Sequence, residues 1–258
     1  MRTIERSMSR KLILREKYKN LREYVAQIPR RFEDEGKTIY QGRNLIKVFD
    51  APHDMQINVK RYRIPAGINR LVYSLGIRKP KGLRGYQYPR LLLEKGVETP
   101  EPIAYIEDRK RGLITYSYLL TVQSKLQHTL YEFGNAPQEQ WQPMVEPLAS
   151  FAAKIHEQQL MHRDFSPGNV LWDVIDGTYQ FSVVDINRMY FGEVDMKQGC
   201  ENFARLWGPK EFFCQLICKY ATIRHFNEEE ALNIALAARK RFWTRYQKKH
   251  EVMFDLEL

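Results

Sequence analysis

The feature that most constrains this 258-residue chain is one short polar segment, His162-Arg163-Asp164-Phe165-Ser166-Pro167-Gly168-Asn169. It follows a stretch with a helical apolar pattern. Asp185 lies sixteen residues after Asn169, directly after the mainly apolar run Phe181–Val184. Residues 171–178, which lie between these two motifs, predict a strand, a turn and a return strand. The fold must therefore deliver a helix, a polar loop, a hairpin and a strand-terminal carboxylate in this order.

That order matches the catalytic loop of kinases, H-R-D with an Asn five residues beyond the Asp. In such a loop Asp164 would reach the acceptor hydroxyl, while Asn169 and Asp185 would reach a metal ion on the nucleotide phosphates. A lone H-R-D triplet carries little weight, because three common residues coincide often. Here the whole order is present, so ordinary roles for Asp164 as a loop aspartate and Asp185 as a turn aspartate are the weaker interpretation.

Upstream, residues 36–64 are predicted to form strands, with a turn at Asp50–Asp54 and a strand that ends near Lys60. The run Ile57-Asn58-Val59-Lys60 resembles the V-A-I-K strand whose Lys contacts the nucleotide phosphates. The alternative is a solvated strand lysine. No G-x-G-x-x-G motif occurs, so a phosphate-covering glycine loop would be degenerate here.

The order of the other predicted strands and helices indicates the fold class. Residues 65–85 hold several Pro and Gly breakers and are expected to be a basic linker, followed by a short helix from Tyr88 or Pro89 to Lys95. Further elements are expected as strands at 103–107 and 112–122 and as helices at 141–159, 199–221 and 228–247, the last with an Asn227 cap. Strands followed by helices predict an α+β fold with a small sheet lobe and a larger helical lobe.

The charge is uneven, with 41 Lys and Arg against 31 Asp and Glu and a formal net charge of +10. The excess falls in residues 1–32 and in residues 55–93, and the second block contains no acidic residue. Such blocks suggest a polyanionic partner: nucleic acid, an anionic membrane or a phosphorylated substrate. A solvated basic face without a partner is the alternative. No recognised nucleic-acid-binding motif occurs, which argues against nucleic acid.

Cysteines and apolar segments indicate the compartment. Three cysteines are too few for a disulfide framework and suit a reducing environment. Cys214 and Cys218 are expected to be buried thiols of an apolar helix rather than a metal or redox site. The longest uncharged apolar stretch, Leu113 to Val122, is too short to span a bilayer, and the N-terminus lacks the features of a signal peptide. The sequence predicts a cytoplasmic protein.

Taken together, these motifs resemble the lipopolysaccharide kinase (Kdo/WaaP) family, small members of the protein-kinase-like superfamily. The resemblance covers most of residues 36–200, and its carrying segments are Asn58-Val59-Lys60, Asn69–Tyr73, Leu91–Gly96, Thr99–Pro102, His162–Asn169 and Val184–Arg188. It implies a two-lobed kinase-like fold, with one helix in a small antiparallel-sheet N-lobe. It also implies ATP- and Mg²⁺-dependent phosphorylation of a sugar hydroxyl of the lipopolysaccharide inner core, on Kdo or heptose, at the cytosolic face of the inner membrane.

By position, the resemblance gives Asp164 the catalytic role of orienting or deprotonating the acceptor hydroxyl. Lys60 would hold the α- and β-phosphates of ATP, and Asn169 and Asp185 would bind the metal and, through it, the nucleotide. The backbone of residues 116–120 would form the hinge under adenine.

Two positions depart from the kinase pattern. In kinases a Glu of the following helix pairs with the phosphate-binding Lys. Here the position expected for that Glu holds the neutral Gln87, and Glu94, two turns further on, is the alternative. Asp185 is followed by Ile186-Asn187 where protein kinases have Phe-Gly, which leaves the metal role intact.

The expected organisation is a basic N-terminal segment at 1–35, an N-lobe at 36–119 and a C-lobe at 120–258. The basic blocks would then hold the enzyme on an anionic membrane beside its glycolipid or saccharide acceptor. A protein kinase, a small-molecule kinase or a non-catalytic pseudokinase of the same fold is the alternative. The short segment after Asp185 lacks A-P-E, which argues against a protein kinase, and the intact polar set argues against a pseudokinase. The sequence does not indicate the acceptor hydroxyl or the oligomeric state.

Overall fold

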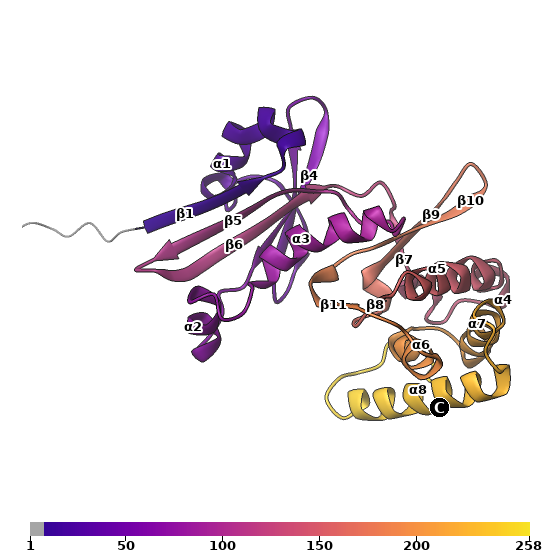
Figure 1. Cartoon of the computed structure of the whole chain (residues 1–258). Helices are drawn as coiled ribbons and strands as arrows, with labels where there is room; N and C mark the ends of the chain where they lie inside the picture. The colour runs from indigo at the N-terminus through magenta and orange to yellow at the C-terminus, as the bar shows by residue number, and fades with distance from the viewer. Residues whose placement is uncertain (1–7) are drawn as a thin grey trace, which may run out of the picture. The chain divides into compact units, whose positions relative to one another are not determined.

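The computed structural model describes residues 8–258, and its contacts divide the chain into two compact units (Figure 1). The first unit runs to Leu92 and resumes over Pro100–Ser124, and the second comprises Leu93–Thr99 and Lys125–Leu258. Residues 1–7, part of the expected basic segment at 1–35, lie outside the described residues. No helix within residues 8–258 combines the length and the apolar character that crossing a membrane requires.

The first unit is built on one antiparallel sheet of six strands in the order β1-β5-β6-β4-β3-β2. The strands are β1 (Met8–Leu14), β2 (Lys37–Gln41), β3 (Leu45–Ala51), β4 (Met55–Tyr62), β5 (Pro102–Lys110) and β6 (Leu113–Val122). The predicted strands in residues 36–64 and 103–122 are therefore confirmed. Alternation places Ile57 and Val59 of β4 in a buried core, since successive strand side chains point to opposite faces.

Residues 8–35 belong to this unit and add a strand to its sheet. They form β1, the 3₁₀ helix η1 (Glu16–Leu21) and α1 (Arg22–Arg31), and β1 pairs with β5 from Met8↔Lys110 to Leu14↔Ala104. Val25 and Ile28 of α1 are buried in the same core as Ile57 and Val59. Charged residues obscured this strand in the sequence, because an edge strand keeps basic side chains exposed.

The prediction of a basic linker at residues 65–85 is wrong, since two helices occupy most of this stretch. They are α2 (Ile68–Ser74) and α3 (Lys81–Glu94), so the predicted short helix starts at Lys81 and contains Pro89. Gly82 and Gly85 allow α3 to approach the sheet closely. A Cβ at Gly82 would lie 2.8 Å from Cε2 of Tyr105, and one at Gly85 would lie 2.8 Å from Cδ2 of Leu119. Glycines that resemble helix breakers are here packing residues.

The prediction that the backbone of residues 116–120 forms the hinge under adenine is also wrong. This stretch lies inside β6, which pairs with β4 on one edge and with β5 on the other. Its backbone groups are therefore used by the sheet and are not available to adenine. The chain leaves the sheet after Val122, and the division between the units falls between Ser124 and Lys125.

The second unit is mainly helical. Its α-helices are α4 (Gln138–Trp141), α5 (Val145–Glu157), α6 (Met196–Asn202), α7 (Lys210–Ile223) and α8 (Glu228–Gln247), and its first 3₁₀ helices are η2 (Leu130–Phe133) and η3 (Gln142–Met144). The predicted helix at 199–221 is interrupted, because η6 (Phe203–Arg205) and Pro209 separate α6 from α7. The Asn227 cap of α8 is confirmed, since its side chain accepts a hydrogen bond from the Glu230 N–H at 2.9 Å.

Two small sheets complete this unit, and both carry the predicted polar motifs. One has the order β10-β9-β7, and the other pairs β11 with β8. Their strands are β7 (His128–Thr129), β8 (Leu160–His162), β9 (Val170–Ile175), β10 (Thr178–Val183) and β11 (Met189–Phe191). The β9–β10 hairpin is the one predicted between the two motifs.

The cysteines pack among apolar residues. Cys200 is buried, whereas Cys214 and Cys218 on α7 are half-buried rather than fully buried. Burial raises the pKa of Cys200 to about 12 and also raises the pKa values of Cys214 and Cys218. All three therefore stay in the thiol form near neutral pH.

Candidate active site

Lys60 lies on β4, an inner strand of the first unit's sheet, opposite Ile46 of β3 and Leu119 of β6. Its neighbour Val59 faces the core, so Lys60 and Tyr62 face the other side of the sheet. That side is covered by α3, because Gly82 and Gly85 pack against Tyr62. The Lys60 Nζ lies 5.4 Å from the centroid of the Tyr62 ring, and the side chain is half-buried.

Of the two partners expected for Lys60, Gln87 has a different role. It is exposed on α3, and its Oε1 accepts a hydrogen bond from the Lys79 Nζ at 3.2 Å. The buried residues of α3 lie on another side of the helix and are Gly82, Gly85, Tyr86, Pro89 and Leu92. Glu94, the other candidate partner, is the last residue of α3 and belongs to the second unit.

In the second unit, His162 ends β8 and braces the loop that follows. Its Nδ1 accepts the Asp164 N–H at 3.2 Å, and its Nε2–H donates to the Val184 carbonyl at 2.9 Å. The ring is only 1% exposed, and burial lowers the pKa of His162. A neutral imidazole with one donor and one acceptor fits both contacts. His162 thus ties the residue before Asp185 to the start of the catalytic loop.

A second brace reaches the same strand through the side chains of Asn202, His156 and Tyr220. The Asn202 Nδ2 donates to the His162 carbonyl at 3.0 Å, and the Asn202 Oδ1 accepts from the His156 Nε2–H at 3.2 Å. The Tyr220 hydroxyl donates to the His156 Nδ1 at 2.8 Å. Burial lowers the pKa of His156 to about 4. His156 is thus a core residue with two side-chain partners, Tyr220 and Asn202.

Asp164 forms an ion pair with Arg205, which lies at the end of η6. The Arg205 guanidinium also lies 5.2 Å from the centroid of the Phe242 ring. Such a pair fixes the direction of a carboxylate oxygen. Sequence reasoning missed Arg205, because 41 residues separate it from Asp164 and it belongs to no motif.

Asn169 ends the 3₁₀ helix η4 (Pro167–Asn169), and its amide is oriented by the loop itself. The Nδ2 donates to the Asp164 carbonyl at 2.9 Å and to the Ser166 Oγ at 3.1 Å. Both amide hydrogens are thereby used, and no hydrogen bond from the described residues reaches the Oδ1. The Asn169 Oδ1 is the atom left to bind a ligand.

Asp185 has a left-handed backbone, with φ 56° and ψ 38°, and precedes the 3₁₀ helix η5 (Ile186–Arg188). Such a conformation is uncommon for residues other than Gly and is often found at functional sites. The Asn187 Nδ2 donates to the Asp185 Oδ1 at 2.5 Å, while the buried Asn187 Oδ1 has no partner among the described residues. Asn187, which the sequence showed only as a departure from Phe-Gly, therefore orients the Asp185 carboxylate.

The structure brings Asp164, Asn169 and Asp185 together in the second unit. The Asn169 side chain contacts the Asp164 carbonyl, and the Val184 N–H donates to the Asn169 carbonyl at 3.0 Å. Carboxylate and amide oxygens are ligands that Mg²⁺ prefers. The Asn169 Oδ1 and the oriented Asp185 carboxylate therefore fit a magnesium ion with bound nucleotide phosphates.

The chain after Asp185 returns at once to the small sheet. Met189 of β11 pairs with His162 of β8, and the Gly192 N–H donates to the Gln159 carbonyl at 2.8 Å. Helix α6 then begins at Met196. The segment between Asp185 and α6 is therefore short, as the sequence indicated, and it pairs with β8.

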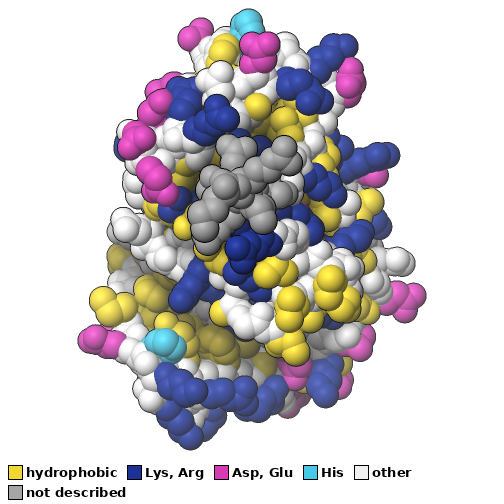
Figure 2. Space-filling view, turned by 90° about the vertical axis from the view of Figure 1, so that its left-hand side faces the viewer, with side chains coloured by type: hydrophobic (Ala, Val, Ile, Leu, Met, Phe, Trp, Pro, Cys, Tyr) yellow, Lys and Arg dark blue, Asp and Glu magenta, His cyan; other side chains and the backbone are white. Residues whose placement is uncertain are grey.

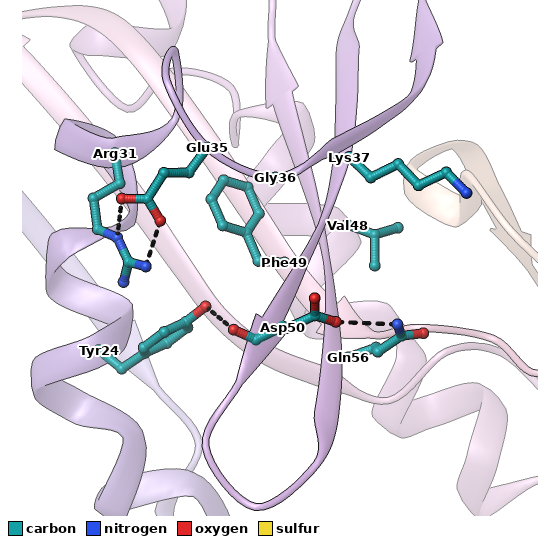
Figure 3. Close-up of a pocket in the computed structure, with 9 residues that line it drawn as sticks. All are labelled: Tyr24, Arg31, Glu35, Gly36, Lys37, Val48, Phe49, Asp50 and Gln56. Atoms are coloured by element: carbon teal, nitrogen blue, oxygen red, sulfur yellow. Dashed lines mark hydrogen bonds and ion pairs between the residues drawn. The ribbon is translucent and has the colours of Figure 1, made fainter.

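A separate hollow of about 340 Å³ in the first unit contains none of the predicted site residues (Figure 3). Its lining residues are Tyr24, Arg31, Glu35, Gly36, Lys37, Val48, Phe49, Asp50 and Gln56. Several of its polar groups are already paired, since Arg31 contacts Glu35 at 2.5 Å and Gln56 donates to Asp50 at 3.1 Å. We therefore do not assign a ligand to it.

Known proteins were matched at the level of family and fold. No curated protein matches the chain. Among solved structures, WaaP in complex with acyl carrier protein superposes with a TM-score of 0.58 and 18% identity, covering 93% of this chain and 100% of that chain. The Rio2 kinase–ADP/Mg²⁺–phosphoaspartate complex from Chaetomium thermophilum has a TM-score of 0.49 and 12% identity. The match covers 87% of this chain and 71% of that chain.

The likeness to WaaP confirms the expected α+β, kinase-like fold. The model of the lipopolysaccharide kinase (Kdo/WaaP) family matches residues 29–209, which include Lys60, Asp164, Asn169 and Asp185. This match spans more than half of the chain and confirms the resemblance seen in the sequence. The chain belongs to the lipopolysaccharide kinase (Kdo/WaaP) family.

Proposed function

We propose that this protein is a phosphotransferase that uses ATP and Mg²⁺ to phosphorylate a sugar hydroxyl of the lipopolysaccharide inner core, on Kdo or heptose. The observation that carries the proposal is the braced loop of the second unit in a chain of this family. There Asn169 is hydrogen-bonded to Asp164 and to Val184, the residue before Asp185, and Arg205 and Asn187 orient the two carboxylates.

In this proposal Asp164 is the catalytic residue and orients or deprotonates the acceptor hydroxyl. General-base catalysis requires a carboxylate that is ionised and aimed at the hydroxyl. The ion pair with Arg205 supports the second condition, because it fixes the direction of one oxygen of the Asp164 carboxylate. Arg205 acts through Asp164 and is therefore a positioning residue.

Asn169 and Asp185 would hold Mg²⁺, and Lys60 would bind the α- and β-phosphates of ATP. Bound Mg²⁺ supplies positive charge that offsets the charge developing on the transferred phosphoryl group. The residues of this chain contribute direction, since Asn187 orients Asp185 and the loop orients the Asn169 amide.

A saccharide acceptor is supported over a peptide by the chain after Asp185. A docked peptide needs an ordered surface there, whereas this segment is short and pairs with β8. Because the proposed acceptor is a glycolipid, we place the enzyme at the cytosolic face of the inner membrane. The absence of acidic residues between positions 55 and 93 supports an anionic surface as its neighbour.

The test is transfer of label from γ-labelled ATP with Mg²⁺ to lipid A–core acceptors, with a peptide mixture assayed beside them. The Asp164→Asn variant is expected to lose transfer by about 10²- to 10⁴-fold, the usual contribution of a general base. Asp176→Asn is the matched control, because Asp176 is an exposed turn residue for which Asn suits the positive φ.

The outcomes separate the alternatives. Label on the glycolipid that is lost in Asp164→Asn supports the proposal, and label on peptides alone identifies a protein kinase. If no acceptor is labelled, small saccharides are tried next and Mg²⁺–ATP binding is measured. A chain that binds no nucleotide would be a pseudokinase, and the proposal would be wrong.

A further inference from the structure

Helix α2 exposes large aliphatic side chains instead of burying them. Ile68, Leu71, Leu75 and Ile77, here called the α2 patch, are 76%, 48%, 71% and 73% exposed. The first three follow the i, i+3, i+7 spacing of one helical stripe, and Ile77 follows the helix end. Soluble proteins normally turn such a stripe toward their core, and a cluster of exposed aliphatic residues indicates an interaction surface.

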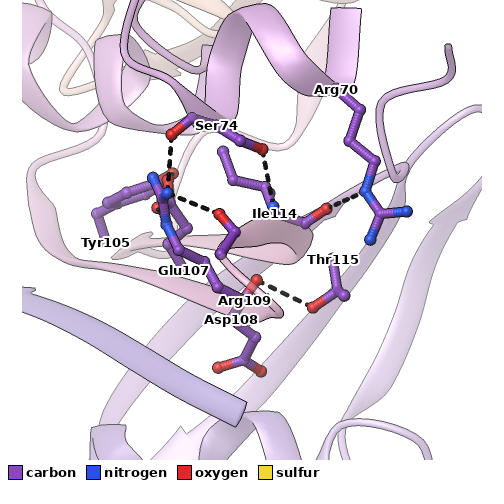
Figure 4. A network of polar contacts seen from close by, with 9 residues as sticks. Arg70, Ser74, Tyr105, Glu107, Asp108, Arg109, Ile114 and Thr115 are labelled. Atoms are coloured by element: carbon purple, nitrogen blue, oxygen red, sulfur yellow. Dashed lines mark hydrogen bonds and ion pairs between the residues drawn. The ribbon is translucent and has the colours of Figure 1, made fainter. Parts of the chain in front are cut away.

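The orientation of α2 is fixed by polar contacts with β5 and β6 (Figure 4). The Ser74 Oγ accepts the Ile114 N–H at 2.9 Å, and the Arg70 Nε donates to the Ile114 carbonyl at 2.8 Å. The Arg109 Nη1 also donates to the Ser74 carbonyl at 2.8 Å. Since the polar side of α2 is held against the sheet, its aliphatic stripe must face outward.

Basic residues precede and follow this patch along the chain and lie at the neighbouring β5–β6 turn. Arg63 and Arg78 are exposed and form no side-chain ion pair with the described residues, and Lys110 and Arg111 lie at the β5–β6 turn beside Arg109. Figure 2, which faces the side where α2 lies in Figure 1, shows hydrophobic side chains next to Lys and Arg side chains there. The surface therefore combines an apolar centre with a positive rim.

We propose that the α2 patch docks this enzyme on an anionic lipid bilayer. The aliphatic side chains would enter the acyl boundary, while Arg63 and Arg78 meet lipid phosphates, the arrangement of interfacial helices. A second copy of the chain is a poorer occupant, because the absence of acidic residues in 55–93 would bring like charges together. The choice of a bilayer rests on the proposed function, whose acceptor is lipid-linked.

The first experiment measures sedimentation with phosphatidylcholine vesicles, with and without phosphatidylglycerol. The wild type is expected to bind the anionic vesicles. The double variant Leu75→Ser with Ile77→Ser should bind them about ten-fold or more weakly, since every methylene withdrawn from a bilayer weakens partitioning about four-fold. Met253→Ser is the matched control, because Met253 is 68% exposed and lies in the second unit.

The second comparison tests the rim. Arg63→Gln and Arg78→Gln should each weaken binding to anionic vesicles about five-fold at low salt and much less at high salt. Lys248→Gln and Lys249→Gln remove the same charges from the end of the second unit and should change binding little. Equal losses in both pairs would mean that only net charge matters, and the docking surface would be refuted.

Insertion is tested with Leu75→Trp. Its emission, after subtraction of the wild-type spectrum, should shift to shorter wavelength on anionic vesicles. No shift, or full vesicle binding by the aliphatic double variant, would overturn the proposal. Loss of self-association in that variant, with vesicle binding intact, would instead assign the patch to a second copy.

Vesicle binding needs neither ATP nor acceptor, so it is independent of the transfer assay. Asp164→Asn should bind vesicles like the wild type. Failure of label transfer with vesicle binding intact would count against the proposed function alone, and the reverse result against the docking surface alone.

Discussion

The catalytic loop region and helix α2 reverse the usual distribution of side chains in opposite ways. Around β8 and β10 the chain buries polar groups, including His156, His162 and Asn187, which are at most 4% exposed. At α2 it exposes aliphatic groups and uses polar contacts to anchor the helix. Buried polar groups and exposed aliphatic clusters are both uncommon unless something compensates for them. In both regions, hydrogen bonds to main-chain groups hold the arrangement.

The difference indicates what each region is built for. Buried, hydrogen-bonded polar side chains fix directions, which suits a site where a carboxylate must meet an oxygen within a fraction of an ångström. A rigid helix with aliphatic side chains outside fixes a surface rather than a point, which suits contact with another phase. Three predictions test this contrast, and a fourth tests how α3 packs.

The largest expected effect comes from the buried imidazole of His156. Its native pKa is about 4, whereas the unfolded chain has a His pKa near 6.5. Between these pH values the His156 ring is protonated in the unfolded state and neutral in the native state. Proton binding therefore stabilises the unfolded state, and the free energy of unfolding falls as the pH falls. The free energy of unfolding should decrease by about 3 kcal/mol from pH 6.5 to 4 because of this group alone.

Urea unfolding of the wild type and of His156→Gln measures this effect, with the variant expected to show the flatter pH profile. The groups facing the ring are Tyr220 and Asn202, with Arg224 nearby as a cation that also disfavours protonation. Titration of the His156 ring by NMR gives an independent value. Protonation of the native ring near pH 6.5 would contradict the prediction.

Asn187→Leu should weaken Mg²⁺ binding in the presence of ATP about 10- to 100-fold, as removal of groups that orient metal ligands commonly does. The reason is loss of the 2.5 Å hydrogen bond to the Asp185 Oδ1. Magnesium dependence of label transfer and direct binding of Mn²⁺ both report the change. Asn233→Leu on the exposed side of α8 is the control, and equal magnesium dependence in both variants would remove Asn187 from the site.

Ser74→Ala should lower the free energy of unfolding by about 1–2 kcal/mol, since it leaves the buried Ile114 N–H without its acceptor. Exchange of the Ile114 amide hydrogen should become faster at the same time. Ser9→Ala on the exposed part of β1 serves as control. Unchanged exchange at Ile114 would show that α2 does not depend on this anchor.

The smallest effect is expected at α3. Gly82→Ala should cost about 1 kcal/mol, because its Cβ would meet the buried rings of Tyr105 and Tyr62, and the crowding outweighs the higher helix propensity of Ala. Gly85→Ala should cost less, since the Cδ2 of Leu119 can rotate away. Thermal unfolding of the two variants measures the difference, and a larger loss at Gly85 would be contrary to this packing.

The sequence by itself determined the elements whose information is local. The order of Asp164, Asn169 and Asp185 could be read directly, because a tight loop and a hairpin leave these residues few relative placements. Strand alternation likewise located Lys60 on β4 with its side chain opposite the core. The roles of these residues as catalyst and as metal and phosphate ligands stay predictions until transfer is measured.

Only the tertiary structure decided which distant residues meet. Arg205 reaches Asp164 across 41 residues, and Asn202 reaches His162 across 40, with no periodic pattern that links either pair. Local pattern also cannot tell a glycine that breaks a helix from one that lets a helix approach a sheet, as at Gly82. The outward stripe of α2 follows from contacts with Ile114, far along the chain. Neighbouring residues determine local backbone conformation through short-range steric preferences. Contacts between residues far apart in the sequence depend on how the whole chain packs.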